Sequence, residues 1–277
     1  MAKKKNESVS IEVMEVQRGE LKFYVKGTEP LILNRLSEKA RRELLLPKGK
    51  KTAADKAMNL KHNPIQEFHD APHYLAPGAG ADKAPTLLAL PCTSFKNAML
   101  TAALDMEGVT KAAIGRQVYV PGEYTPVYGI PKLYMRPVRS ADMNRTPDIR
   151  TRVILPEWCC ELTVQFAKPI LREKPVANLL AAAGFMSGMG DFRPEKGKGT
   201  NGQFVLVGDG DKDFKRIVKN GGRAQQIEAM QAAEAYDDET SELLSWFTGE
   251  AHNRGWAFDD TGAAYQPETS DNGKAKA

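Results

Sequence analysis

The sequence predicts an α+β fold whose core follows the order strand, helix, strand, strand, helix, strand (βαββαβ). Apolar residues alternate as in a strand near the N-terminus and again at residues 158–167. Each of these two regions is followed by a segment with a helical apolar stripe, at residues 91–106 and 175–186. A short apolar run at residues 204–208 supplies the last strand. Long segments between these elements indicate insertions in the core.

The first strand region covers residues 11–33, where Leu21, Phe23 and Val25 alternate with polar residues before Pro30. Residues 34–62 combine spaced apolar residues with many cations and predict a short basic helix followed by a charged stretch. Residues 63–90 are rich in Pro, Gly, Ala and His and predict a long loop, which in a compact domain is usually functional or disordered.

The helix at residues 91–106 has Thr93 or Ser94 as its N-cap and Gly108 as its stop. Strands are expected around residues 117–120, 127–134 and 150–155, and most clearly at 158–167. Pro175 opens the second helix. A helical region at about 222–248 carries an apolar face around Leu243 and Trp246, which is expected to pack on the domain or on a neighbouring protomer. The order of the core elements is that of the ferredoxin-like plan, whose open sheet face is a common platform for single-stranded nucleic acid.

Charge is distributed unevenly along the 277 residues, although the net charge is only +4. Residues 224–277 hold three basic and eleven acidic side chains, whereas residues 1–223 hold 36 basic and 24 acidic ones. A basic body with an acidic end favours a polyanionic partner, unless the acidic end is simply solvated. We therefore expect a domain at 1–223, with insertions near 34–86 and 109–150, and an acidic helical extension and tail at 224–277.

The composition narrows the functional classes. A hydrophobic content of 42% with 27% charged residues is ordinary for a globular protein, and no run of 18 apolar residues exists. No apolar segment follows the basic N-terminus, so we expect a cytoplasmic protein without contact to a membrane. Three cysteines, two of them adjacent, give neither a disulfide framework nor the spacing of a zinc site. No cofactor is expected.

Residues 188–204, GMGDFRPEKGKGTNGQF, raise the question of a nucleotide-binding loop. Gly197-Lys198 is followed by Gly199 instead of the Ser or Thr of a phosphate-binding loop, and Arg193 stands where a dinucleotide fingerprint needs its third glycine. The chain direction is also reversed, because a helix precedes this stretch and a strand follows it. The pattern therefore argues against a nucleotide cradle.

The same stretch fits a flexible loop that contacts a polyanion. Its glycines permit a close backbone approach, and its cations would neutralise phosphates. Phe192 or Phe204 would stack on a base or anchor the loop in the core. The alternative is a basic hairpin tip without a ligand. The residues assigned to binding are the glycines Gly188, Gly190, Gly197 and Gly199 and the cations Arg193, Lys196 and Lys198.

A second group of cations lies near the predicted strand ends, interleaved with aromatic residues. Such interleaving supports binding of a single strand by stacking and phosphate contact, although each aromatic taken singly is more often a core residue. The cations are Lys132, Arg136, Arg139, Arg145, Arg150 and Arg152, and the aromatics are Tyr128, Tyr134, Trp158 and Phe166.

Three histidines, His62, His69 and His73, cluster with Glu67 and Asp70 in the sequence. They would serve a metal site or general acid–base cleavage of RNA if they shared one face of a helix. The prolines within and around this segment oppose such a helix, and an inert loop cluster is the preferred interpretation. We assign no catalytic and no metal-binding residue.

Residues 91–100, PCTSFKNAML, resemble the PGSSLKGALR helix of the RAMP superfamily, the repeat-associated RNA-binding proteins of CRISPR systems. The glycine-rich segment 184–204 resembles the other hallmark of that superfamily. Cys92 and Asn97 replace two expected glycines, and Leu100 replaces the usual arginine. The resemblance covers roughly residues 18–208 and is nearer the backbone-forming Cas7-like proteins than the Cas6 processing nucleases. A virus- or plasmid-borne relative is equally compatible.

Similarity to Cas7-like proteins implies an RRM-type fold and side-by-side assembly along a single strand, with the insertions as projections. It also makes Asp70 a candidate for RNA cleavage, because some Cas7-like subunits use a loop aspartate. The expected function is non-enzymatic binding of single-stranded RNA, or DNA, by a homo-oligomer or a subunit of a ribonucleoprotein complex. Lys96, Arg136, Arg139, Arg150 and Arg152 would line the track with the loop cations. The alternatives are a metal-independent endoribonuclease, a single-stranded-DNA-binding protein, and a protein-interaction module acting on a CRISPR complex.

Overall fold

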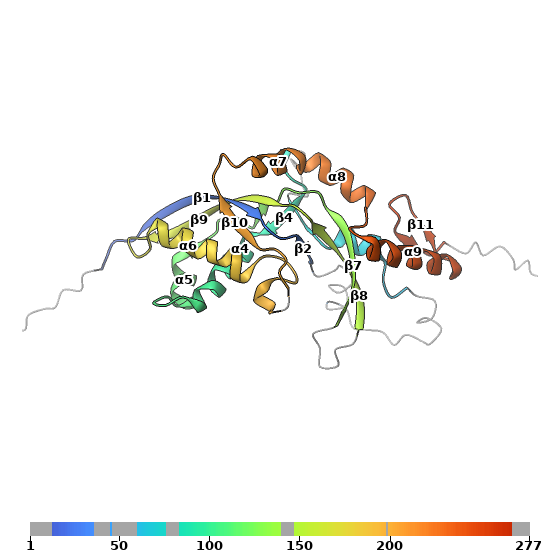
Figure 1. Ribbon diagram of the computed structural model, residues 1–277, viewed down its shortest axis with the longest axis horizontal. Helices are drawn as coiled ribbons and strands as arrows, with labels where there is room; N and C mark the ends of the chain where they lie inside the picture. The colour runs from blue at the N-terminus through green and yellow to red at the C-terminus, as the bar shows by residue number, and fades with distance from the viewer. Residues whose placement is uncertain are drawn as a thin grey trace, which may run out of the picture.

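The computed structural model describes residues 13–35, 45, 60–75, 83–139, 147–197 and 199–267. In this part of the chain, helices and strands alternate and form an elongated body (Figure 1). The α+β class that the sequence predicts is confirmed. The basic helix expected within 34–62 lies almost entirely outside the described residues.

The largest sheet has four strands in the order β10-β1-β9-β5, and every neighbouring pair is antiparallel. Its strands are β1 (Gln17–Gly27), β5 (Val118–Tyr119), β9 (Cys159–Lys168) and β10 (Phe204–Val207). Helix α4 (Cys92–Ala102) lies between β1 and β5 in the chain, and helix α6 (Glu173–Ala182) lies between β9 and β10. Both helices lie on the same side of this sheet (Figure 1).

Two three-stranded sheets accompany the four-stranded one, and their strands lie partly inside and partly outside the segments 34–86 and 109–150. The order β2-β8-β7 joins β2 (Leu31–Leu33), β8 (Pro147–Leu155) and β7 (Lys132–Arg139), and the last two form a long hairpin. The order β3-β4-β6 joins β3 (His73–Tyr74), β4 (Leu88–Pro91) and β6 (Tyr124–Pro126). Helix α5 (Lys111–Gln117) lies beside α4. Short helical turns follow α4 at Ala103–Asp105 (η2), follow α6 at Ala183–Ser187 (η3), and lie in the glycine-rich stretch at Pro194–Lys196 (η4).

The long loop predicted for residues 63–90 is wrong in its first part. Residues Pro64–Asp70 form helix α3, with Pro64 in its first turn, where the missing N–H costs nothing. Ile65 and Phe68, three residues apart, are both buried on its inner face. The prolines that argued against a helix therefore flank it: Pro64 begins it, and Pro72 follows its end.

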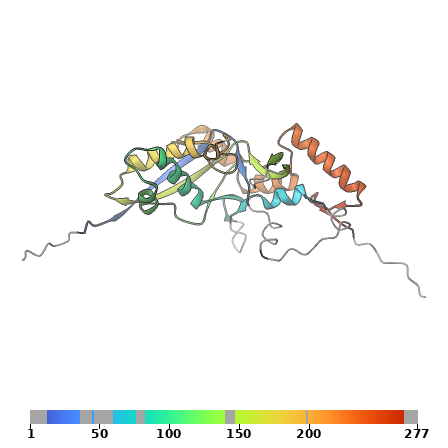
Figure 2. The ribbon, with the colours of Figure 1, turned by 90° about the horizontal axis from the view of Figure 1, so that it is seen from below.

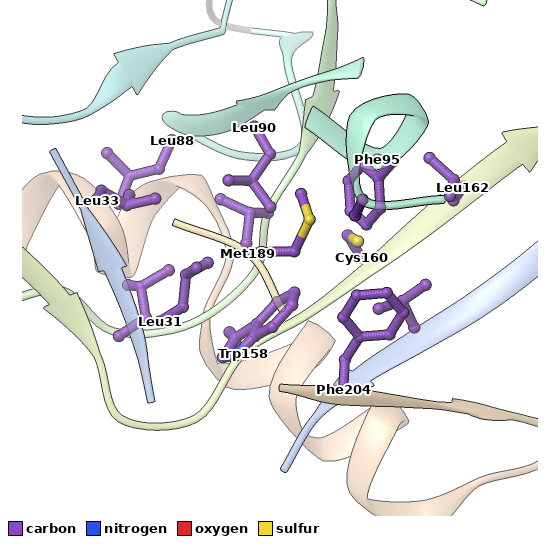
Figure 3. Close-up of a cluster of buried hydrophobic side chains, with 14 of the residues drawn as sticks. Leu31, Leu33, Leu88, Leu90, Phe95, Trp158, Cys160, Leu162, Met189 and Phe204 are labelled. Atoms are coloured by element: carbon purple, nitrogen blue, oxygen red, sulfur yellow. The ribbon is translucent and has the colours of Figure 1, made fainter. Parts of the chain in front are cut away.

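The core extends from the helix-covered face of the four-stranded sheet to the β2-β8-β7 sheet (Figure 3). Phe95 of α4 and Phe204 of β10 meet edge to face at 6.0 Å, and Phe204 also contacts the ring of Trp158. The Trp158 indole N–H donates to the carbonyl of Glu29 over 2.9 Å. The same indole lies against Gly27, where a Cβ atom would come within 2.2 Å of Nε1, so this position tolerates only glycine.

The C-terminal part folds back on the body through α7 (Lys212–Asn220), α8 (Arg223–Ala232), α9 (Asp238–Asn253) and the hairpin β11 (Ala257–Phe258) and β12 (Ala264–Tyr265). Gln226 of α8 is fully buried. Its side-chain oxygen accepts from the N–H groups of Leu87 and Leu88, and its amide N–H donates to the carbonyls of Val127, Gly129 and Gly221. Residues 234–236 pair with Leu133 at the β7 edge of the β2-β8-β7 sheet. Seen from below, α9 stands out at the end of the molecule opposite α5 (Figure 2).

Candidate nucleic-acid interface

The glycine-rich stretch, residues 188–203, forms a loop between η3 and β10 that packs against β2. The N–H of Asp191 donates to the carbonyl of Ile32 over 2.9 Å, and the N–H of Gly202 donates to that of Pro30 over 2.7 Å. A Cβ atom at Gly190 would come within 2.3 Å of the Ile32 carbonyl, and the backbone φ of Gly190 is +73°. This glycine therefore serves the close approach of two backbones within the protein.

The other three predicted loop glycines have related roles. A Cβ atom at Gly199 would come within 1.6 Å of the carbonyl of Phe192, across the loop. Gly188 and Gly197 have φ of +64° and +70°, and only Gly197 has open space around it. The loop is thus shaped mainly by contacts inside the protein, and its glycines need no bound phosphate to explain them.

The loop cations differ in what they contact. The Arg193 guanidinium donates to Glu195 over 2.6 Å and to the carbonyl of Gly190 over 2.7 Å. Arg193 therefore links two other residues of the same loop and stabilises its conformation. The Glu195 carboxylate also accepts from Thr101 of α4. Lys196 is exposed, and its ammonium group forms no ion pair with another described residue. Lys198 lies outside the described residues.

The helix and the loop that the sequence singled out are neighbours in space, although about 90 residues separate them. Ser187, at the start of the loop, donates to the carbonyl of Ala98 in α4 over 3.1 Å. Together with the end of β2, the helix and loop enclose a cavity of about 270 Å³. Its polar lining includes Asn34, Arg35, Ser94, Asn97, Asp191 and Arg193.

Lys96 lies on another face of α4, away from this cavity. Its ammonium group is 4.6 Å from the ring centroid of Tyr119, an exposed residue of the edge strand β5. Lys96 and the loop cations are therefore separated by the width of the helix.

Beside the cavity, one face of the β7–β8 hairpin carries cations and aromatic rings. Lys132, Tyr134 and Arg136 of β7 stand opposite Ile154, Arg152 and Arg150 of β8. Directly opposed residues of an antiparallel pair share a face, so Lys132, Tyr134 and Arg136 lie on one face with Arg150 and Arg152. Arg139, opposite Pro147, is three positions from Arg136 and lies on the other face of the hairpin. Arg139 and Arg150 are exposed, and neither forms an ion pair with another described residue.

Arg152 is the most unusual residue of this face. It is only 2% exposed, and the ring of Phe192 covers it at 5.6 Å from the guanidinium carbon. Its Nε lies 3.0 Å from an Asp191 carboxylate oxygen, which also accepts from Asn34 over 3.0 Å. The N–H direction does not suit a hydrogen bond, so within the described residues Nε and Nη1 of Arg152 have no hydrogen-bond partner. Burial lowers the pKa of Arg152, yet an arginine stays charged in a protein.

The two phenylalanines of residues 188–204 differ in their exposure to solvent. Phe204 is buried in the core, whereas Phe192 is 41% exposed and has a left-handed backbone with φ of +54°. The loop thus holds a large aromatic ring in solvent above the buried guanidinium of Arg152, which is paired with Asp191. We call Phe192, Arg152, Tyr134 and Arg150 the Phe192 surface.

Arg136 takes another role than the one predicted from its position. Its guanidinium forms an ion pair with Asp237 and lies 3.3 Å from Glu239, at the start of α9. The hydrogen bond from Arg136 lowers the pKa of Asp237 to about 2. The charge of Arg136 is therefore neutralised inside the protein, where it holds α9 against β7. Arg145, in the hairpin tip, lies outside the described residues.

The open face of the four-stranded sheet lacks the features expected of a nucleic-acid platform. Lys22 pairs with Glu161, and Lys26 pairs with Asp211 and Asp213. Tyr24 meets Phe214 of α7 edge to face at 5.4 Å, so its ring is partly covered. Helix α7, which the sequence analysis missed, covers this end of the face. The signal that reveals it is the apolar stripe of Phe214, Ile217 and Val218 within a lysine-rich segment.

The histidines of the sequence cluster point to three different places. His62 lies between Glu67 and Asp148, at 2.8 and 2.9 Å, and the hydrogen bond to Glu67 raises its pKa. Burial lowers the pKa of His69, whereas His73 lines the cavity and packs on Tyr124. Among the described residues, no group of three or more His, Cys, Asp or Glu side chains is arranged to hold a metal ion.

Comparison with known proteins adds little information about this candidate site. No protein-family model and no curated protein matches the chain. One solved structure that matches is the crystal structure of Cmr6 from Pyrococcus furiosus, at 9% identity and a TM-score of 0.35. The match covers 69% of this chain and 98% of that one. A TM-score this low carries no argument about function. In the described part of the chain, no helix is long and apolar enough to cross a membrane.

Proposed function

We propose that the protein binds single-stranded nucleic acid, preferably RNA, without cutting it, and that copies of the chain assemble along the strand. One observation carries the proposal: the Phe192 surface places an exposed aromatic ring and the exposed Arg150 beside the glycine loop. Single strands are bound by proteins that combine stacking rings with cations along the backbone. We interpret the four-stranded sheet with α4 and α6 as the ferredoxin-like core, and the β7–β8 hairpin as a projection from it.

Binding starts with a base stacked on the outer side of the Phe192 ring. The inner side of that ring rests on Arg152, whose buried guanidinium is paired with Asp191 and holds the ring in place. The phosphates on either side of the base meet Arg150 from the hairpin and Lys196 and Lys198 from the loop, and Arg139 is a separate contact on the other face of the hairpin. Neither the stack nor these ion pairs reads a base edge, so the binding is independent of sequence.

We assign the predicted residues to this surface, or away from it, according to their ion pairs within the protein. Arg136 and Arg193 are paired with carboxylates inside the protein, so they shape the surface rather than bind phosphate. Lys96 is a separate contact beyond the helix. Arg152 contributes by supporting the Phe192 ring, because its guanidinium is buried and paired with Asp191.

Salt dependence tests the proposal. Each phosphate contact to a single strand contributes about −0.7 to the slope of log affinity against log salt. Replacing Arg150, Lys196 and Lys198 by alanine together is expected to flatten the slope by about 2 units, measured by fluorescence anisotropy with a labelled RNA oligonucleotide. The matched control replaces Lys111, Arg172 and Lys174, three exposed cations at the α5 end, and should leave the slope unchanged.

The outcomes separate the alternatives. Absence of binding to any RNA or DNA oligonucleotide at low salt would refute the proposal and leave a protein-interaction role. Shortening of the labelled RNA in the presence of a chelator would establish an endoribonuclease instead. Tighter binding of the DNA oligonucleotide of the same sequence would reverse the preference for RNA.

A further inference from the structure

Helix α7 carries a stripe of three lysines that the proposed binding surface does not use. Lys212, Lys215 and Lys219 are spaced three and four residues apart, so they share one face of the helix. All three are exposed, and none forms an ion pair with another described residue. The acidic neighbours are already paired: Asp211 with Lys26, and Asp213 with both Lys26 and Arg216.

This lysine stripe does not belong to the Phe192 surface. Helix α7 packs on the face of the four-stranded sheet opposite the one that α4 and α6 cover (Figure 1). The glycine loop lies on the α4 side, against α4 and β2. The aromatic ring of α7, Phe214, is buried, so the stripe offers no ring on which a base can stack. An acidic protein surface is therefore a better partner for it than a single strand.

Helix α9 carries the complementary pattern. Asp238, Glu242 and Trp246 are spaced four residues apart and lie on one exposed face, and Trp246 is 66% exposed. The acids next to them are paired within the chain, Asp237 and Glu239 with Arg136 and Glu250 with Arg254. Asp238 and Glu242 form no ion pair with another described residue. A tryptophan face attracts a lysine ammonium much as a carboxylate does.

The two stripes match in length as well as in charge. At a rise of about 1.5 Å per residue, the lysines of α7 span about 10 Å and the three acceptors of α9 span about 12 Å. Each lysine thus has one acceptor within reach when the helices lie side by side. Within one molecule α7 packs on the four-stranded sheet and α9 on β7, so the stripes do not meet there.

We propose that α9 of one copy binds α7 of the next copy through these stripes. Each copy binds one neighbour through its α7 stripe and the other neighbour through its α9 stripe. The contact is therefore head to tail, and an open assembly has one unpaired stripe at each end. Such a contact builds a ring or an open chain rather than a closed dimer. The inference rests on the proposed function only in taking the array along the strand to consist of copies of this chain.

The test uses two charge-reversal variants of the full chain and needs no nucleic acid. One carries Lys215→Glu and Lys219→Glu in α7, and the other carries Glu242→Lys and Trp246→Lys in α9. Sedimentation velocity of nuclease-treated protein at low salt should show assemblies for the unchanged chain. Each variant alone should associate roughly tenfold more weakly or worse, and circular dichroism should show that both remain folded. An equimolar mixture should recover assemblies in which the two variants alternate, because the unchanged stripes pair with each other and the two reversed stripes are again opposite in charge.

Three results would overturn the inference. The unchanged chain remains monomeric at low salt, or the variants assemble as well as the unchanged chain, or the mixture shows no recovery. The α7 variant is also tested in the oligonucleotide assay. A loss of salt slope there without a change in assembly would assign the lysines to nucleic acid instead. Assembly without any oligonucleotide binding would refute the proposed function and leave this inference standing.

Discussion

Replacing Phe192 by alanine removes the ring on which the proposed binding mode depends. The outer side of the ring is open to solvent and the inner side rests on Arg152, so one base is expected to stack there. Stacking of one base on an aromatic side chain is worth about 1–3 kcal/mol. Since 1.4 kcal/mol is tenfold, the variant should bind an RNA oligonucleotide about 5- to 150-fold more weakly.

The fold should survive this change. Phe192 is 41% exposed, and substitutions at such surface positions change the free energy of unfolding by less than about 1 kcal/mol. Phe192→Gly serves as a second variant, because glycine adopts the φ of +54° without strain and should bind as weakly as the alanine variant. The matched control is Phe185→Ala, which removes a ring that is 73% exposed in η3, the turn that precedes the loop.

The assay is fluorescence anisotropy at one fixed salt concentration, with urea unfolding of each variant in parallel. Affinity equal to that of the unchanged protein for both Phe192 variants would refute the stacking role. An equal loss in Phe185→Ala would show that the effect is not specific to the loop. A fall in stability that accounts for the whole loss of binding would also contradict the reasoning.

Three further predictions concern the scaffold. Gln226→Leu leaves two N–H groups and three carbonyls without their partner, and should lower the free energy of unfolding by about 2–5 kcal/mol in urea titration; a loss below 1 kcal/mol would contradict the role of this side chain. The stabilisation by His62, whose pKa is raised, is fully present below its ordinary pKa of 6.5 and is lost as pH rises through the raised value. His62→Gln should therefore flatten the pH dependence of stability in that window, and identical profiles would refute it. Gly190→Ala should destabilise by roughly 1–3 kcal/mol because its Cβ meets a carbonyl, whereas Gly208→Ala, with open space around it, should not; equal melting temperatures would contradict this account.

The core elements of the fold could be predicted because their patterns are local. The apolar alternation of residues 158–167 and the proline that opens residues 175–186 mark β9 and α6 to within a few residues. Helix α3 was missed because its prolines were interpreted only as breakers, although Pro64 occupies a favourable first-turn position. Helix α7 was missed because its lysines hide a short apolar stripe.

The sequence indicated which segments lie close together at the candidate site, but not which of its cations are neutralised by ion pairs. The PCTSFKNAML helix and the glycine-rich stretch do meet, at the cavity between α4 and the loop. Which cations remain free depends on carboxylates far away in sequence, such as Asp237 for Arg136, about 100 residues apart. The covering of Arg152 by Phe192 depends on the loop conformation, and no spacing in the sequence encodes it. Pattern analysis therefore identifies the basic residues but not the ion pairs that neutralise some of them.

Residues 234–236 run along the outer edge of β7, with hydrogen bonds from the N–H of Leu133 to the carbonyl of Glu234 and from the N–H of Tyr236 to the carbonyl of Leu133. An uncovered strand edge pairs readily with other chains and promotes aggregation. A protein cut at residue 223 would lose this cover and Gln226 together, so its poor behaviour would reveal nothing about the acidic charges. The role of the C-terminal acids is better studied in the full-length chain, by single substitutions on the solvent-facing side of α9.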